Sequence, residues 1–275
     1  LEVHQQAGAG IDLDDGPLLP GEGLGDVLAD QIDASDVQAD DARRQARILL
    51  RGARFAAIGV LDPETGFPFV SRVLLGTDSD GAAVILVSNL SAHTTALLAD
   101  PRASLLTGEP AKGDPLAHPR LTLQCTAESV ERDSDAHRRL RARFLARHPK
   151  SQLYIDFPDF RFFRLRPERA SLNGGFGRAY HLSSSDFLIP KIDDDLFGDE
   201  DGLLRELGGR HPDLATRIAT EIHGAPEGDW RMSAIDSQGL DIVFKDKLIR
   251  HEFVTPITNS GDLLLELPKS VYAVP

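Results

Sequence analysis

Ser88, Ser91 and His93 lie close together where an apolar segment gives way to a helix-forming one. Ser91 is a good N-cap residue, and the free backbone N–H groups at the start of a helix attract phosphate. Arg72, on the preceding apolar segment, would add a positive charge that pairs well with phosphate oxygens. The spacing predicts either a phosphate-binding junction or an ordinary strand and capped helix with nothing bound.

The elements that position these residues are a β-hairpin and a short helix. Two apolar runs, Val70 to Leu75 and Ala82 to Val87, flank the turn signal Asp78-Ser79-Asp80-Gly81. The helix after Ser91 ends at Asp100-Pro101, because proline disfavours the helical conformation in the residue before it. Further strands are predicted at Phe55 to Leu61, from Leu105, at Leu121 to Glu131 and at Phe160 to Leu165. Such a series of antiparallel strands favours a small closed barrel.

Changes in composition divide the 275 residues into parts, and the length favours two domains. The predicted parts are a Gly- and Asp-rich N-terminal arm (1–39), a β-barrel domain (40–188), an acidic linker (189–202) and a C-terminal α/β domain (203–275). The fold class is therefore α+β. The acidic linker is interpreted as a hinge, and no metal site is predicted.

Several helices and strands complete this interpretation. Helices are predicted at Asp40 to Leu50, Ser134 to Arg147, Gly202 to Leu207, Asp213 to His223 and after Ser260; strands are predicted at Arg231 to Ile235, Leu240 to Phe244 and Ile249 to Phe253. The helix ending at Arg147 is rich in arginine, and we interpret most of these arginines as its solvated face.

The composition excludes several classes of partner. A net charge of −13 argues against nucleic acid and anionic membranes, which need a basic face. No apolar run approaches the about 18 residues of a transmembrane helix, and no signal peptide is recognised. Cys125 is the single cysteine and is predicted to be a buried strand thiol, which suits a reducing compartment, so a cytoplasmic location is expected.

The order of these elements resembles the FMN-binding split-barrel family typified by pyridoxamine 5′-phosphate oxidase. Within it the chain is most similar to the HugZ-like haem-utilisation branch, which adds a small α/β domain. The matching segments are Arg120-Leu121-Thr122-Leu123-Gln124, Tyr154 to Phe160 and Gly174-Gly175-Phe176-Gly177-Arg178-Ala179. The resemblance implies a homodimer whose two subunits together form a site for a small-molecule cofactor or substrate.

The resemblance also implies roles for individual residues. Arg72, Val73 and Leu74 would line a flavin, and Ser88 and Ser91 would approach its phosphate. His93 would stand where the oxidases have a basic residue. Gln124 would lie on a strand beside the flavin ring, and Gly175 and Arg178 would lie close to the cofactor or the second subunit. The leading hypothesis is therefore an FMN-binding oxidoreductase of unknown substrate.

Departures from the family pattern leave two alternatives open. The chain has Leu75-Gly76-Thr77 and Ser91-Ala92-His93 where the oxidases carry additional basic residues, which weakens the phosphate clamp. The first alternative is haem binding and degradation, with His181, His211, His223 or His251 as the axial ligand and Arg178 as a propionate partner. The His-Met-Asn-x-Asp-His motif usual in the HugZ-like branch is missing from this sequence. The second alternative is a binding or regulatory module that keeps the fold without a cofactor.

Overall fold

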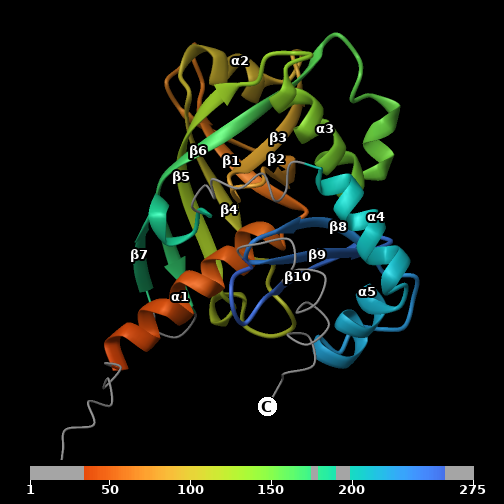
Figure 1. Ribbon diagram of the computed structural model, residues 1–275. Coiled ribbons are helices and arrows are strands. Elements are labelled where there is room, and N and C mark those ends of the chain that lie inside the picture. Colours follow the sequence, from red (N-terminus) through yellow and green to blue (C-terminus); the bar gives the residue numbers. More distant parts are fainter. Residues whose placement is uncertain (1–33, 175–178, 190–198, 258–275) are drawn as a thin grey trace, which may run out of the picture.

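The computed structural model describes residues 34–174, 179–189 and 199–257 (Figure 1). Gly175, Arg178, the arm up to residue 33, most of the acidic linker and the helix expected after Ser260 lie outside these residues. Among the described residues, no helix is both long enough and apolar enough to cross a lipid bilayer.

An antiparallel barrel forms the larger part of the protein. Its strands are β1 (Phe55–Leu61), β2 (Pro68–Thr77), β3 (Ala83–Ser88), β4 (Arg102–Thr107), β5 (Arg120–Ser129), β6 (Phe160–Asn173) and β7 (Ala179–Ser183). The strand order is β3-β2-β1-β4-β5-β6-β7, and pairing of β3 with β6 closes the barrel. Every second residue of β1 is buried, as a strand with one face on a core requires. The predicted barrel and the α+β class are confirmed.

Three helices surround the barrel: α1 (Ala34–Arg51), α2 (Ala92–Ala99) and α3 (Asp135–Arg147). Figure 1 shows α2 at the top of the barrel and α1 crossing its lower part. Leu97 of α2 and Leu50 of α1 belong to the same apolar core as the inward side chains of the strands. Short 3-10 turns occur at Pro115–Ala117, Pro149–Leu153 and Ser184–Asp186.

The C-terminal domain is a small sheet with helices at its side. It contains α4 (Glu200–Arg210), α5 (Leu214–Arg217), a π-helical turn at Ile218–Ile222, β8 (Arg231–Asp236), β9 (Gly239–Phe244) and β10 (Lys247–Glu252). The sheet order is β10-β9-β8, and α4 and α5 lie along one side of it (Figure 1). Trp230, Leu214 and Ile242 are buried in its separate apolar core.

The interpretation of the α3 arginines as a solvated face was wrong at two positions. Arg143 is buried, where its Nε donates to the Thr77 carbonyl at 2.9 Å and its guanidinium pairs with Glu200. Arg147 is also buried and donates to the Arg51 carbonyl. The apolar stripe of α3 packs on the barrel, and the long arginine side chains at its margin reach the second domain.

A buried network of charges joins the two domains. Arg147 Nη2 lies 2.8 Å from Asp241 Oδ2, and Arg47 of α1 lies 2.8 Å from Glu252. Within the C-terminal domain, Arg250 Nη2 lies 2.6 Å from Asp236 Oδ1. Because a buried charge is costly unless it is paired, these contacts couple the position of the small sheet to that of the barrel.

Three elements differ from the predictions. Helix α1 begins at Ala34 rather than Asp40, β6 continues to Asn173 rather than ending near Leu165, and β7 was not predicted. The second half of β6 carries outward charges that hide its strand pattern, although its inward residues Leu165 and Leu172 are in the core. Strand β7 is short and is held by pairing with β6.

Candidate functional site

The outer face of the barrel carries the first group of candidate residues. On β2, Val70, Arg72 and Leu74 are exposed, whereas Val73 is in the barrel core. Successive side chains of a strand point to opposite faces, which explains this division. The side chain of Val73, which was predicted to line a cofactor, points into the barrel core and away from this surface.

Strand register brings Arg72 and His181 into one row across this face. Arg72 pairs with Ala57, and Ser171 pairs with His181. The complete row, from β2 to β7, is Arg72, Ala57, Leu106, Thr122, Ser171 and His181. The neighbouring row is Val70, Gly59, Ser104, Gln124, Arg169 and Ser183. Between Arg72 and His181 the first row therefore carries small side chains and Leu106, whereas the second row carries Gln124 and Arg169 next to small residues.

The polar groups of this face have defined partners. The Arg72 guanidinium carbon lies 5.0 Å from the centre of the Phe55 ring, and Arg169 Nε donates to Gln124 Oε1. His181 Nδ1 lies 3.4 Å from Ser171 Oγ, and in the described part of the chain no group bonds to its Nε2. One imidazole nitrogen is thus available to an external ligand.

Large apolar side chains are exposed on and beside these rows. The exposed fractions are 74% for Phe67, 65% for Val70, 46% for Leu106 and 37% for Leu74. Soluble monomers rarely leave such side chains together in water, so the patch is a candidate surface for a ligand or a second subunit.

The α2 junction differs from the phosphate cradle expected there. Ser88 Oγ donates to Asp159 Oδ2 at 2.8 Å, which places a carboxylate beside the expected phosphate position. Ser91 stands at the N-cap position of α2 without a side-chain capping bond. His93 Nδ1 lies 3.0 Å from Ser71 Oγ, and burial lowers the pKa of His93, so its neutral form is favoured at pH 7. Asp159 lies in the turn directly before β6, and no motif around it in the sequence predicts this contact with Ser88.

Arg72 does not join the α2 junction. It follows Ser71 directly on β2, so the two side chains project to opposite faces of the strand. Ser71 contacts His93, whereas Arg72 lies on the outer face. The structure therefore separates the expected positive charge from Ser88, Ser91 and His93, and it adds a negative charge at Asp159.

The other candidate histidines lie in the C-terminal domain. His211 follows α4 as its C-cap residue. His223 Nε2 lies 3.2 Å from His251 Nδ1, and His251 is buried. Burial, followed by repulsion from His223 and nearby arginines, lowers the pKa of His251 to about 4. His181 is the member of the predicted ligand set that lies on the outer face of the barrel.

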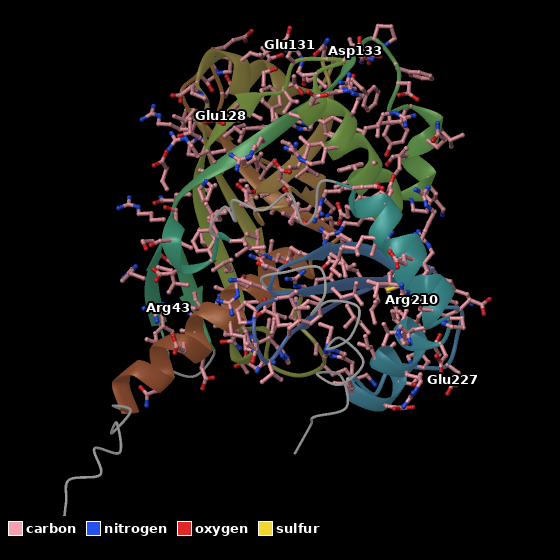
Figure 2. The ribbon with its side chains drawn as sticks, in the orientation of Figure 1. Arg43, Glu128, Glu131, Asp133, Arg210 and Glu227 are labelled. Atoms are coloured by element: carbon pink, nitrogen blue, oxygen red, sulfur yellow. The ribbon has the colours of Figure 1, made fainter. Side chains whose placement is uncertain are left out.

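Charged side chains elsewhere are spread over the surface rather than gathered at one site. Figure 2 shows Glu128 and Glu131 near the top of the barrel, Arg43 on α1 and Arg210 at the end of α4. Among the described residues, no group of three or more His, Cys, Asp or Glu side chains is placed to hold a metal ion. Burial raises the pKa of the Cys125 thiol to about 12, which agrees with the predicted buried strand thiol.

Comparisons with known proteins place the chain among split-barrel proteins. Residues 37–188 match the family model described as CREG, beta-barrel. The non-canonical haem oxygenase HOZ of Arabidopsis thaliana is 34% identical over 135 residues, which are 46% of this chain and 40% of that protein. The haem oxygenase HutZ of Vibrio cholerae is 32% identical over 130 residues, which are 45% of this chain and 71% of HutZ.

Solved structures extend the likeness to most of the described fold. A protein of unknown function from Agrobacterium tumefaciens has a TM-score of 0.72 at 29% identity, covering 85% of this chain and 95% of its own. A haem-binding protein from Mycobacterium smegmatis has a TM-score of 0.51 at 28% identity, covering 85% and 98%. The family match covers more than half of the chain and confirms the resemblance found in the sequence. The chain therefore belongs to the CREG β-barrel family of split-barrel proteins.

Proposed function

We propose that this protein binds haem on the outer face of the barrel and degrades it oxidatively. The single observation that carries this proposal is the row that ends at His181, whose Nε2 has no partner among the described residues and whose neighbours in the row are the small residues Ser171 and Thr122. The names of the relatives in Arabidopsis and Vibrio, both haem oxygenases, support the same function. Haem degradation is thus favoured over the FMN-dependent chemistry that led the sequence-based hypotheses.

The residues of this face fit the chemical needs of haem. An axial imidazole holds the iron, cationic groups hold the propionates, and apolar surface covers the ring. His181 offers the imidazole, and Arg169 is its diagonal neighbour across β6 and β7, about 7–8 Å away between Cα atoms. Leu106 and Val70 offer exposed apolar surface. The iron supplies the oxygen chemistry, while these side chains bind the ring, orient it and exclude water.

One chain cannot surround such a ligand by itself. Arg72 and His181 are separated by five strand-to-strand steps, or about 24 Å along the sheet at ~4.8 Å per step. A single porphyrin does not span this distance. The exposed apolar residues of β2 and β4 would therefore cover a ligand that is held by His181 of a second copy of the chain, so we propose a homodimer with the ligand between the outer faces.

The α2 junction provides less support for FMN. The Asp159 carboxylate next to Ser88 repels a phosphate, and a neutral His93 adds no charge to attract one. Removing the charged hydrogen bonds of a phosphate clamp costs about 1.5–3 kcal/mol each. The cofactor-free module remains the competing hypothesis that the following experiment decides.

Titration of the purified protein with haem tests the proposal. We expect a Soret band in the wild type and, in His181→Ala, a shifted band with affinity lowered at least about 10-fold, equivalent to ~1.4 kcal/mol. His118→Ala is the matched control, because His118 lies in a loop and contacts the Lys112 carbonyl. Loss of the band under oxygen with a reductant tests the degradation step.

Each outcome has a clear meaning. An unchanged band in His181→Ala would show that His181 is not the ligand. A stable band under oxygen and reductant would reduce the function to haem binding. If the wild type does not bind haem but quenches the fluorescence of added FMN, it binds FMN, and the flavin hypothesis is restored. If it binds neither ligand, the cofactor-free module is the remaining hypothesis.

A further inference from the structure

A groove lies between α1 and the lower part of the barrel, away from the face that carries His181. It encloses about 700 Å³, which is within the usual range of small-molecule sites. Ala42 and Leu49 of α1 line it together with Pro119 and Tyr180. Tyr180 and His181 are consecutive on β7, so their side chains point to opposite faces of that strand. The groove is therefore separate from the proposed haem site.

One positive side chain on the groove wall forms no ion pair or hydrogen bond with the other described residues. Arg44 lines the groove and is exposed, and within the described ranges it has neither an ion pair nor a side-chain hydrogen bond. Its neighbours on α1 differ: Arg43 lies 2.9 Å from Asp186, and Arg47 lies 2.8 Å from Glu252. Figure 2 shows Arg43 on this helix. The arginines around Arg44 attach α1 to its surroundings, whereas Arg44 does not.

Along α1 the groove wall is mainly polar at Gln38, Asp41, Arg44 and Gln45 and apolar at Ile48 and Leu49. Ile48 follows Arg44 by one helical turn and, with Leu49, continues the wall as apolar surface. Asp41 precedes Arg44 by one turn on the same wall and forms no ion pair with it. Burial, followed by the charge of Arg44, lowers the pKa of His223, which shows that the positive field of Arg44 extends toward the C-terminal domain.

We propose that this groove binds a small amphipathic carboxylate, with its anionic head on Arg44 and its apolar body along Ile48, Leu49 and Tyr180. A guanidinium offers a planar pair of donors that matches a carboxylate, and the apolar wall gains free energy when it covers a hydrocarbon chain. Asp41 lies one turn before Arg44 and repels an anion, so the carboxylate head would approach Arg44 from the side of Ile48. This binding site goes beyond haem chemistry and does not depend on it.

Calorimetric titration of the 275-residue protein with dodecanoate and with dodecanol separates the contribution of the ligand's head group from that of its hydrocarbon tail. We expect saturable dodecanoate binding in the wild type and at least about 10-fold weaker binding in Arg44→Gln, because one charged hydrogen bond is lost. Dodecanol should bind equally to both proteins. Ile48→Ser should weaken both ligands. Arg210→Gln is the matched control, because Arg210 lies on α4 and pairs with Glu206.

Three results would overturn this proposal: no saturable dodecanoate binding, unchanged binding in Arg44→Gln, or an equal loss in Arg210→Gln. Haem titration of Arg44→Gln keeps the two proposals distinguishable. An unaltered Soret band together with lost dodecanoate binding supports a separate site. Loss of both with an unchanged circular dichroism spectrum would show that the groove belongs to the haem site and would refute a separate carboxylate site. If the spectrum shows that Arg44→Gln is misfolded, Ile48→Ser decides instead, and unchanged dodecanoate binding in that variant refutes the site.

Discussion

Replacing Asp241 with alanine removes the negative charge that joins the two domains. Asp241 Oδ2 lies 2.8 Å from Arg147 Nη2, and its Oδ1 lies 3.2 Å from Arg250 Nη1. All three side chains are buried, so the remaining guanidinium groups cannot turn to water. Arg250 keeps Asp236 as a partner, but Arg147 is left with backbone carbonyls alone. Removing one partner of a buried ion pair costs about 3–5 kcal/mol.

This loss is a large share of the ordinary stability of a domain, about 5–15 kcal/mol. With a denaturant dependence of about 3 kcal/mol per molar urea, the unfolding midpoint should fall by about 1–1.7 M. Trp230 is the single tryptophan and is buried in the C-terminal core, so its fluorescence reports the unfolding of that domain. Circular dichroism follows the barrel in the same titration.

Two control variants show whether burial of charge is the cause. Arg102→Gln removes the exposed pair with Asp100 and should cost at most about 1 kcal/mol. The double variant Arg147→Met with Asp241→Leu removes both charges and should be more stable than Asp241→Ala. A loss below about 1 kcal/mol in Asp241→Ala, or a double variant less stable than the single one, would refute the reasoning.

Two further outcomes follow from buried groups. Burial lowers the pKa of His148 and of His251 from 6.5 to about 4, so between these pH values the unfolded chain binds protons that the folded chain does not. The free energy of unfolding should therefore fall by about 3 kcal/mol per histidine as the pH drops from about 6.5 to about 4, and these two histidines should add no further pH dependence below pH 4. In urea titrations at several pH values, His148→Gln should show a weaker pH dependence than the wild type. An identical pH dependence in the variant would contradict this prediction. Gly81 has a φ of +84°, and an added Cβ would lie 2.6 Å from Nη2 of the buried Arg51, whereas Gly66, at +72°, has nothing within 4 Å. Gly66→Ala should cost about 1–2 kcal/mol and Gly81→Ala clearly more, as measured by thermal unfolding; equal losses would refute a steric contribution from Arg51.

Local patterns in the sequence were sufficient for most of the elements. The apolar runs of β1, β2 and β3 predicted strands, and Asp100-Pro101 predicted the end of α2. These signals are local because strand and helix periodicity depend on neighbouring residues. Strand β7 carried no comparable signal, because its five residues are stabilised by pairing with β6.

The candidate site was predicted less well than the fold. Arg72 and His93 were expected to act together, but Ser71 and Arg72 project to opposite faces of β2. The position of Arg147 was also misjudged, since a charged residue at a helix margin is solvated only if no other domain covers it. Both errors concern where a side chain points or whether another part of the protein buries it, and residue type alone determines neither.

The sequence by itself determined the series of antiparallel strands, the split-barrel family and the set of histidines proposed as haem ligands. The tertiary structure decided which of these side chains share a surface. Strand register placed His181 at the end of a row that begins at Arg72, and the docking of α3 against the C-terminal domain buried Arg147 beside Asp241. Register and docking arise from contacts between residues far apart in the chain, and for this reason local pattern could not reveal them.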